Sequence, residues 1–175
     1  MRKAQTIWLT GLPSAGKTTL ASALHHKLCE QGIASVMIDG DDFRKSFCTD
    51  LDFSLEARRE NIRRAASMAR MVNDSGVIAI CSFVSPTTAI RQLAKAIVGD
   101  DVFVEVYVNT PLDVCKQRDV KGLYHQASLG SIKDLTGVSS PYEAPENPAI
   151  QVDTSQGTWL ENIDYLVNLI LQKFC

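Results

Sequence analysis

The stretch TIWLTGLPSAGKTTL, residues 6–20, decides the fold of this chain. A mostly apolar run is followed at once by the spacing Gly11-x-x-x-x-Gly16-Lys17-Thr18. In a loop of this kind the backbone amides surround phosphate groups, the lysine reaches the outer phosphates, and the threonine hydroxyl takes a ligand position on magnesium. The glycines matter because a Cβ atom would block close approach or the backbone angles that the loop requires.

The setting of this spacing agrees with a phosphate-binding loop (P-loop). An apolar strand pattern precedes it and a helical pattern follows it. The alternative is a glycine turn that merely caps a helix. We predict that the chain binds a nucleoside triphosphate through Gly11, Leu12, Pro13, Ser14, Ala15, Gly16, Lys17, Thr18 and Thr19. Because the sequence lacks the Asn-Lys-x-Asp element of guanine-binding switches, an adenine-type kinase fits better.

Length and composition are those of an ordinary globular domain. The chain has 175 residues, of which 45% are hydrophobic and 22% charged, and its formal net charge is −2. We therefore expect a single domain over residues 1–175. The charge balance gives no global reason to expect a nucleic acid or an anionic membrane surface as a partner. No apolar run approaches the ~20 residues that a membrane-spanning helix needs.

The cysteines and the N-terminus bear on the compartment. No C-x-x-C pair occurs among Cys29, Cys48, Cys81, Cys115 and Cys175. An odd, unpatterned set is typical of small buried apolar groups in a reducing compartment, and it does not favour metal binding. The N-terminal MRKAQTIW reaches the glycine loop too soon to be a signal peptide. These features predict a cytoplasmic protein.

Short apolar runs alternate along the chain with longer helical patterns. Most of the runs are nearly continuous in valine, isoleucine and phenylalanine, which is typical of strands buried on both faces and favours a parallel sheet. We predict strands at residues 6–10, 34–38, 77–83, 102–108 and 149–153. We predict helices at about residues 17–31, 55–75, 87–98, 111–118 and 158–173. Thr110 and Pro111 supply a cap and a first-turn proline for the fourth helix.

This alternation indicates an α/β fold with three layers, α/β/α, of the P-loop nucleotide-binding type, around a mostly parallel five-stranded sheet. Such a sheet binds ligands at the carboxyl ends of its strands. Residues 119–148 are weakly patterned and contain several glycines and prolines. A long segment of this kind inside a compact domain is usually functional, so we expect a lid there.

Acidic residues follow the second predicted strand. The stretch VMIDGDDFR, residues 36–44, places Asp39, Asp41 and Asp42 around Gly40. One carboxylate can hold magnesium, directly or through water, and another can orient or deprotonate an acceptor hydroxyl. We assign the metal to Thr18 and Asp39. The alternative is an Asp-Gly turn with solvated acids, in which Arg44 is a surface residue.

The long predicted helix carries an arginine on its inner face. Its apolar stripe runs from Ile62 to Val72, Arg58 lies four residues before the start of the stripe, and Asn61 lies on its edge. A guanidinium aimed inward near a helix start is costly unless it meets an anion. A structural ion pair with an aspartate is one explanation. We favour an anionic substrate held by Arg44 and Arg58, with Asn61 recognising a polar group beside them.

Two further residues have two interpretations each. Phe53, just before the long helix, is either a hydrophobic staple or a face on which a base stacks. Ser85 and Pro86 end the stretch SFVSP, residues 82–86, and look like a helix N-cap followed by a first-turn proline. The Ser85 hydroxyl can also touch substrate.

An ordered set of motifs resembles one kinase family. The motifs GLPSAGKTT, DGDDFR, FSLEARRENIRR, SFVSP, VCKQRDVKGLY, IKDLTG and PYEAPENP look like those of adenylylsulfate kinases and run from about residue 6 to residue 154. The resemblance implies a P-loop α/β fold and a homodimer. It also implies transfer of the γ-phosphate of ATP, with magnesium, to the 3′-hydroxyl of adenosine 5′-phosphosulfate, the reaction of sulfate assimilation.

The resemblance implies roles for individual residues. The catalytic set is Lys17, Asp41 and Ser85, in which Asp41 faces the acceptor ribose as the base. Ser85 matches a position described as a phosphoenzyme serine, although direct in-line transfer needs no such intermediate. Arg118 lies near the ATP base, and Lys121 in the lid meets both ligands. The residues implied to hold the adenylylsulfate are Arg44, Phe53, Arg58, Asn61, Val84 and Ser85.

Departures from the family pattern concern the acceptor side. The usual IKGFTG is IKDLTG here, so Leu135 replaces the second aromatic of a base sandwich and Asp134 replaces a glycine. Loss of one stacking face weakens base binding by about 1–3 kcal/mol. Two alternatives therefore stand beside adenylylsulfate phosphorylation. One is a related kinase for another anionic nucleotide, such as a nucleoside diphosphoramidate, and the other is a non-catalytic nucleotide-binding module.

Overall fold

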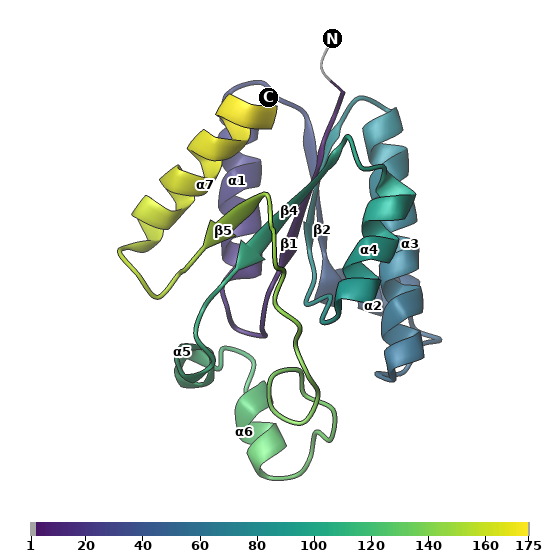
Figure 1. Cartoon of the computed structure of the whole chain (residues 1–175), viewed down its shortest axis with the longest axis vertical. Coiled ribbons are helices and arrows are strands. Elements are labelled where there is room, and N and C mark those ends of the chain that lie inside the picture. The colour runs from purple at the N-terminus through teal and green to yellow at the C-terminus, as the bar shows by residue number, and fades with distance from the viewer. Residues whose placement is uncertain (1–2, 175) are drawn as a thin grey trace.

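The computed structural model describes residues 3–174, and this range contains five strands and seven helices (Figure 1). The strands are β1 (Thr6–Thr10), β2 (Ser35–Asp39), β3 (Ile78–Ser82), β4 (Phe103–Val108) and β5 (Ile150–Val152). The helices are α1 (Lys17–Glu30), α2 (Gly40–Phe47), α3 (Leu55–Asp74), α4 (Thr88–Val98), α5 (Leu112–Arg118), α6 (Leu123–Ser128) and α7 (Trp159–Phe174).

β1 lies at the centre of an entirely parallel sheet. The strand order is β2-β3-β1-β4-β5, and every pairing is parallel. Leu9 of β1 pairs with Ser82 of β3 on one side and with Val106 of β4 on the other. All five residues of β1 are buried, as expected for a strand that is paired on both edges and covered on both faces. The predicted parallel five-stranded α/β fold is confirmed.

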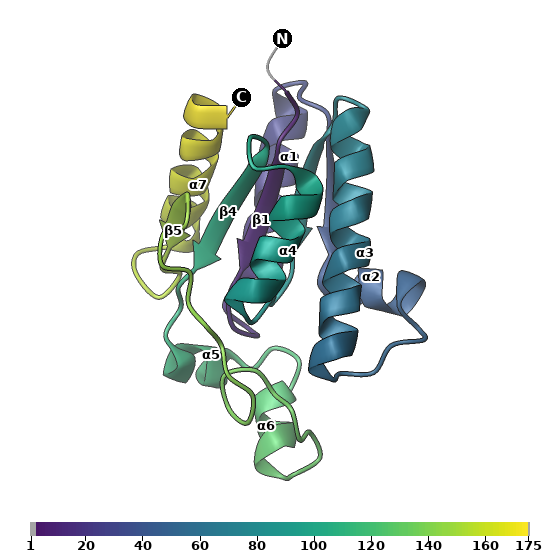
Figure 2. The same ribbon diagram turned by 45° about the vertical axis from the view of Figure 1, so that its right-hand side comes forward.

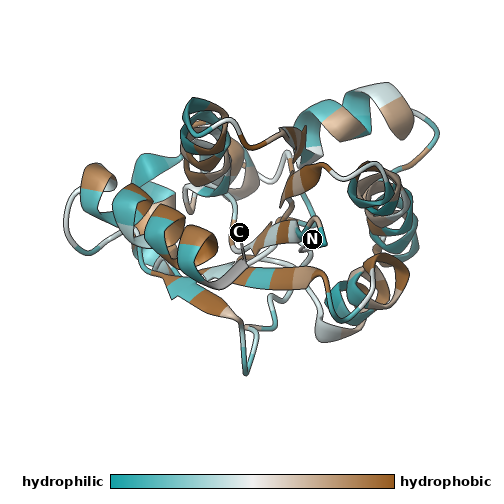
Figure 3. Cartoon of the chain, turned by 90° about the horizontal axis from the view of Figure 1, so that it is seen from above, coloured by the Kyte–Doolittle hydropathy of each residue, from teal (hydrophilic) through white to brown (hydrophobic). Residues whose placement is uncertain are grey.

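Helices cover both faces of the sheet (Figures 1 and 2). α1 and α7 pack together on one face, and α3 and α4 pack together on the other. α5 and α6 lie beyond the carboxyl ends of the central strands, at the end of the molecule opposite the start of β1. Seen from above, the strands lie between the two helical layers, and the helices carry both apolar and polar residues (Figure 3). The predicted lid segment thus lies at the edge where a parallel sheet binds its ligands.

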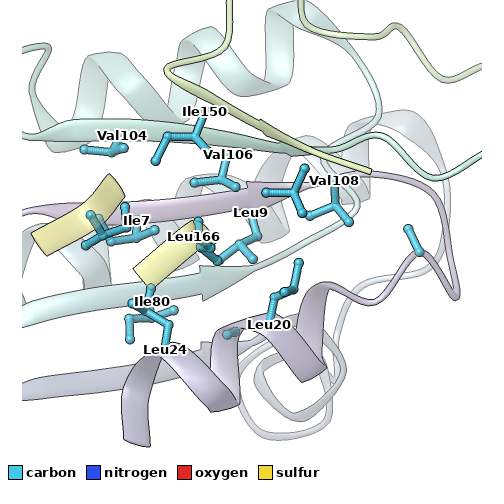
Figure 4. Close-up of a cluster of buried hydrophobic side chains, with 14 of the residues drawn as sticks. Ile7, Leu9, Leu20, Leu24, Ile80, Val104, Val106, Val108, Ile150 and Leu166 are labelled. Carbon is cyan, nitrogen blue, oxygen red and sulfur yellow. The ribbon is translucent and has the colours of Figure 1, made fainter. Parts of the chain in front are cut away.

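Side chains of β1 alternate between two apolar cores. Ile7 and Leu9 point to the side of α1 and α7, where they join Leu20 and Leu24 (Figure 4). Trp8 points to the opposite side and belongs to the core formed with α3 and α4. Its ring lies 5.1 Å from that of Phe83 and 5.7 Å from that of Phe103.

Two short helices, α2 and α6, are absent from the predicted pattern. α2 begins directly after β2, where the Oδ1 atom of Asp39 accepts a hydrogen bond from the Asp41 amide at 3.0 Å and caps the helix. Gly40 is needed at this junction because a Cβ atom would lie 2.9 Å from the Ser82 carbonyl oxygen. A glycine among aspartates is typical of a turn, so the sequence pattern conceals the helix. α6 lies inside the predicted lid.

Two predicted helix caps are wrong. α4 begins at Thr88, and Thr87 rather than Ser85 caps it, accepting from the Ile90 amide at 3.3 Å. α5 begins at Leu112 without a side-chain cap, because the Thr110 hydroxyl donates instead to the Ala15 carbonyl at 3.0 Å. The Ser85 and Thr110 hydroxyls instead make hydrogen bonds at the carboxyl edge of the sheet, to Trp8 and to Ala15, and do not cap the helices that follow them.

The cysteines partly follow their prediction. Those between residues 3 and 174 are free thiols, and Cys48, Cys81 and Cys115 are buried. Cys29 is exposed because it lies on the solvent side of α1, and Cys175 lies outside the described residues. In the part of the chain that the structure covers, no helix is both long enough and apolar enough to cross a membrane.

Candidate active site

The predicted phosphate loop joins β1 to α1 at the carboxyl edge of the sheet. Gly11 and Gly16 have positive φ angles of 154° and 104°. At Gly11 a Cβ atom would lie 2.6 Å from the Val108 carbonyl oxygen, so a larger residue does not fit. α1 begins at Lys17 with no side-chain cap on its first amides. Those amides are free to bind an anion, which agrees with the predicted role of the loop.

Lys17 lies inside the loop. Lys17 is only 8% exposed, and its Nζ atom donates to the carbonyl oxygens of Gly11 at 3.0 Å and Leu12 at 2.7 Å. Burial is the main cause that lowers the pKa of Lys17 to about 8. No ion pair among the described residues includes this lysine. A phosphate group would supply the ion-pair partner that no carboxylate of the described residues provides.

Oxygen atoms suited to a magnesium ion lie beside the loop. The Thr18 hydroxyl donates to Asp39 Oδ2 at 2.8 Å and lies 3.4 Å from the Ser82 hydroxyl. Mg²⁺ prefers oxygen ligands and is usually held by one or two protein groups together with water and substrate phosphates. Among the described residues no cluster of three or more His, Cys, Asp or Glu could hold a metal alone. Thr18 and Asp39 therefore fit an ion that is shared with the phosphates.

The lid contacts both the loop and α2. The Tyr124 hydroxyl in α6 donates to the Pro13 carbonyl at 3.0 Å. Lys121 Nζ is hydrogen-bonded to Asp41 Oδ2, in the first turn of α2. The predicted base and the predicted lid lysine are thus ion-paired with each other.

Arg44 and Phe53 form a flat, partly open surface. The Arg44 guanidinium lies 4.6 Å from the centre of the Phe53 ring and donates to the Asp52 carbonyl at 2.7 Å. The Phe53 side chain is 63% exposed, and the residue where a staple would pack, four positions after the Ser54 cap, is Arg58. These observations exclude the staple and favour a stacking face.

Arg58 is half-buried and has no carboxylate partner among the described residues. Its guanidinium donates to the Phe53 carbonyl at 2.9 Å and, across to the lid, to the Thr136 hydroxyl at 3.0 Å and the Asp134 carbonyl at 2.7 Å. Burial, followed by the nearby charge of Arg44, lowers the pKa of Arg58. Two guanidinium groups therefore lie close together without a carboxylate ion pair. That arrangement suits an anionic ligand better than a structural ion pair.

Asn61 adds an unused acceptor on the same helix. The residue is 7% exposed, and within the described residues its buried amide oxygen has no hydrogen-bond partner. Buried polar groups are nearly always paired, so an orphan needs an explanation. A ligand that donates a hydrogen bond at this position would provide one.

Ser85 and Val84 border the site from the end of β3. Ser85 is 2% exposed, and its hydroxyl accepts a hydrogen bond from the Trp8 indole at 3.1 Å. The Val84 carbonyl accepts from the Thr10 hydroxyl at 2.8 Å. Both residues are fixed by the central strand, and the Ser85 hydroxyl is directed into the protein towards an indole.

Arg118 lies beside the glycine loop near the Ala15 carbonyl, and it faces Trp159, an aromatic residue that the sequence prediction missed. It donates to the Thr154 hydroxyl and carbonyl, both at 2.7 Å, and its guanidinium lies 5.1 Å from the Trp159 ring centre. The Trp159 ring edge would come within 2.5 Å of a Cβ atom at Gly16. The one available signal was a tryptophan at the start of the helix that follows the last strand.

Leu135, the predicted partner of Phe53 in a base sandwich, is buried. It is 6% exposed and belongs to the apolar core on the side of α1 and α7. Its amide donates to the Ser139 hydroxyl at 3.0 Å in a tight lid turn. Leu135 therefore anchors the lid, and its part in binding a base stays a prediction.

Comparison with known proteins identifies the family of this site. The family model described as Adenylylsulphate kinase matches residues 3–153. The adenylyl-sulfate kinase of Shewanella amazonensis is 49% identical over 165 residues, which cover 94% of this chain and 83% of that protein. The adenylyl-sulfate kinase of Prochlorococcus marinus is 46% identical over 171 residues, which cover 98% of this chain and 83% of that protein.

A solved structure agrees with these sequence relatives. The APS kinase of Mycobacterium tuberculosis in complex with AMPPNP and APS superposes with a TM-score of 0.93 at 35% identity, covering 98% of this chain and 99% of that one. The glycine loop, the two neighbouring arginines and the predicted lid are therefore found on a fold and a sequence shared with known kinases. The chain belongs to the adenylylsulfate kinase family.

Proposed function

We propose that this enzyme transfers the γ-phosphate of ATP to the 3′-hydroxyl of adenosine 5′-phosphosulfate. The observation that carries the proposal is the pair of guanidinium groups, Arg44 and Arg58, which lie close together without a carboxylate ion pair among the described residues. A phosphosulfate offers negative charge to both. Family membership supports the same reaction.

The donor side binds ATP through the loop. The first amides of α1 and the Lys17 ammonium group face the position that phosphates take in such a loop. Thr18 and Asp39 would hold Mg²⁺, which neutralises charge on the phosphates when it is bound. Arg118 and Trp159, at the far end of the loop, form a flat surface suited to the adenine ring.

The acceptor side orients the attacking hydroxyl. Arg44 and Arg58 grip the phosphosulfate, Phe53 stacks on the base, and Asn61 accepts a hydrogen bond from the ligand. Asp41 accepts the proton of the 3′-hydroxyl as the new oxygen–phosphorus bond forms and the bond to ADP breaks. Lys121 must first leave Asp41, because the ion pair occupies a carboxylate oxygen that the 3′-hydroxyl would otherwise contact. Phosphates bound nearby offer the lysine an alternative partner.

We further propose a cytoplasmic homodimer. The resemblance of the motifs to the family supports the dimer, and the free cysteines among the described residues agree with a reducing compartment. Light scattering on the purified enzyme tests the assembly. A mass of about twice 19.2 kDa is expected, and a mass near 19.2 kDa would contradict it.

A coupled ADP-release assay with a panel of acceptors tests the reaction. The panel contains adenosine 5′-phosphosulfate, AMP and a nucleoside diphosphoramidate, each with ATP and magnesium. The highest kcat/KM is expected for adenosine 5′-phosphosulfate. A clear preference for another anionic nucleotide, or ATP binding without turnover of any acceptor, would overturn the proposal.

A further inference from the structure

The loop after β3 contains an unusual backbone conformation. Ser85 has a positive φ of 38° although it is not glycine, and it is 2% exposed. A side chain disfavours this region, so it persists only where the surroundings impose it. Trp8 donates to the Ser85 hydroxyl and Thr10 donates to the Val84 carbonyl at 2.8 Å. The Thr10 hydroxyl reaches the Ser85 carbonyl only at 3.5 Å, so a closer donor is needed to fix that carbonyl.

Arg91 fixes that carbonyl from α4. One amino group of its guanidinium donates to the Ser85 carbonyl at 3.1 Å, and the other donates to the Thr88 hydroxyl at 3.3 Å. The side chain is 4% exposed. It lies among the buried residues of an otherwise apolar helix face, next to Ile90 and Ala94. An arginine so placed is costly unless all its donors are used.

Glu105 of β4 completes the arrangement. Its Oε1 atom lies 3.1 Å from Arg91 Nε, and its side chain is 21% exposed. Burial raises the pKa of Glu105, against the opposing effect of the arginine charge. The Tyr142 ring covers the guanidinium at 5.9 Å, and its hydroxyl lies 3.0 Å from that of Thr10.

This buried pair has no evident structural need. Apolar residues of similar volume usually stabilise a core as well as a buried ion pair does. The pair fixes the orientation of the Arg91 side chain, because a planar guanidinium held by a carboxylate presents its remaining donors at fixed positions. Those donors point at the loop that borders the acceptor side.

We propose that Arg91, oriented by Glu105, is a positioning residue that fixes the Ser85 carbonyl and so sets the Val84–Ser85 edge against which the acceptor nucleotide binds. The inference rests on the proposed function, which places the acceptor at this edge. It assigns Arg91 no contact with either substrate.

Steady-state kinetics of Arg91→Met, Arg91→Lys and Val98→Ala test the proposal. Val98 is fully buried on the same helix and its apolar side chain makes no hydrogen bond. Val98→Ala therefore controls for a general loss of stability. Arg91→Met should raise the KM for the acceptor by about tenfold and leave the KM for ATP within about twofold. Arg91→Lys keeps the charge without the planar fork and should recover only part of the loss. Val98→Ala should lower Tm without separating the two KM values.

The proposal is overturned if Arg91→Met changes both KM values equally, or if Val98→Ala produces the same split. Should Arg91→Met fail to fold, Glu105→Gln keeps the shape of the pair and should raise the acceptor KM by about threefold. An unchanged KM in that variant also overturns it. The acceptor used is whichever nucleotide the wild type phosphorylates best. A wrong substrate therefore shows in the wild type alone, and a wrong positioning role shows only in the variants.

Discussion

Lys17 and Arg58 are cations that the fold withdraws from water without giving either a carboxylate ion pair among the described residues. Lys17 donates to carbonyl oxygens of its own loop, and Arg58 donates to carbonyl oxygens and to the Thr136 hydroxyl. Neutral acceptors compensate only part of the loss of hydration of a buried cation. Each residue therefore has binding energy to gain from an anion, and the two lie on the donor and the acceptor side.

The lowered pKa of Lys17 predicts that the protein takes up protons when ATP binds. Burial is the main cause that lowers the pKa of Lys17 to about 8, and nearby phosphates should raise it. Between about pH 8 and pH 9 the bound state should therefore hold more protons than the free state, whereas near pH 7 both states are protonated. Calorimetry in two buffers of different ionisation enthalpy measures this uptake. Heats of binding that do not depend on the buffer near pH 8.5 would contradict the prediction.

Asp41 predicts a selective loss of turnover. Asp41→Asn removes the proton acceptor and should reduce kcat by about 10²–10⁴-fold while changing the Kd for ATP by less than about threefold. Asp42→Asn is the matched control, because that exposed neighbour pairs with Lys45 on the outside of α2. Full turnover in Asp41→Asn, or an equal loss in the Asp42 variant, would remove Asp41 from its role.

At the scale of elements, α2 is placed by a single glycine. A Cβ atom at Gly40 would meet the Ser82 carbonyl at 2.9 Å and the Phe83 ring at 3.0 Å. Gly40→Ala should therefore shift α2, lower the free energy of unfolding by about 1–3 kcal/mol and reduce kcat, because Asp39 and Asp41 move with the helix. Urea denaturation and kinetics measure both effects. Ser46→Ala, exposed on the same helix, is the control. Equal free energies of unfolding for the two variants would contradict the prediction, because they would show that the close contact at residue 40 costs no stability.

The elements could be predicted from the sequence where one local rule applied. Nearly continuous apolar runs predicted the strands, and the stripe from Ile62 onward predicted that Arg58 points inward. α2 was missed because Gly40 among aspartates favours a turn, whereas its close contact with β3 is made by residues distant in sequence. The predicted Ser85 cap was wrong for a similar reason. The Ser85 hydroxyl is bonded to Trp8 and its carbonyl to Arg91, and neither contact can be read from the stretch SFVSP.

Long-range contacts also explain what was missed in the site. Nothing in the local sequence relates Trp159 to Arg118, although the two face each other beside the glycine loop. The contact of Tyr124 with the Pro13 carbonyl likewise joins segments that no motif connects. The residues named from motifs, by contrast, could be found because their spacing reflects a local chemical requirement.

At the scale of the whole molecule, the lid joins the glycine loop to α2 and α3. It contacts the glycine loop through Tyr124, α2 through Lys121 and α3 through the bonds that Arg58 makes to residues 134 and 136. Both of the cations in these contacts, Lys121 and Arg58, are also proposed to bind ligand. Ligands therefore compete with the contacts that join the lid to α2 and α3, which couples binding to movement of the lid.

The central claim is that an anionic nucleotide binds to Arg44 and Arg58 while ATP binds at the glycine loop. The kinetics of Arg58→Ala with ATP and adenosine 5′-phosphosulfate test it most directly, with Arg63→Ala as control because Arg63 pairs with Glu60 on the outer face of α3. We predict that Arg58→Ala raises the KM for the acceptor by about ten- to a hundredfold, changes the KM for ATP by less than about twofold, and that Arg63→Ala changes neither. Equal effects of Arg58→Ala on both substrates, or no effect on the acceptor, would contradict the account.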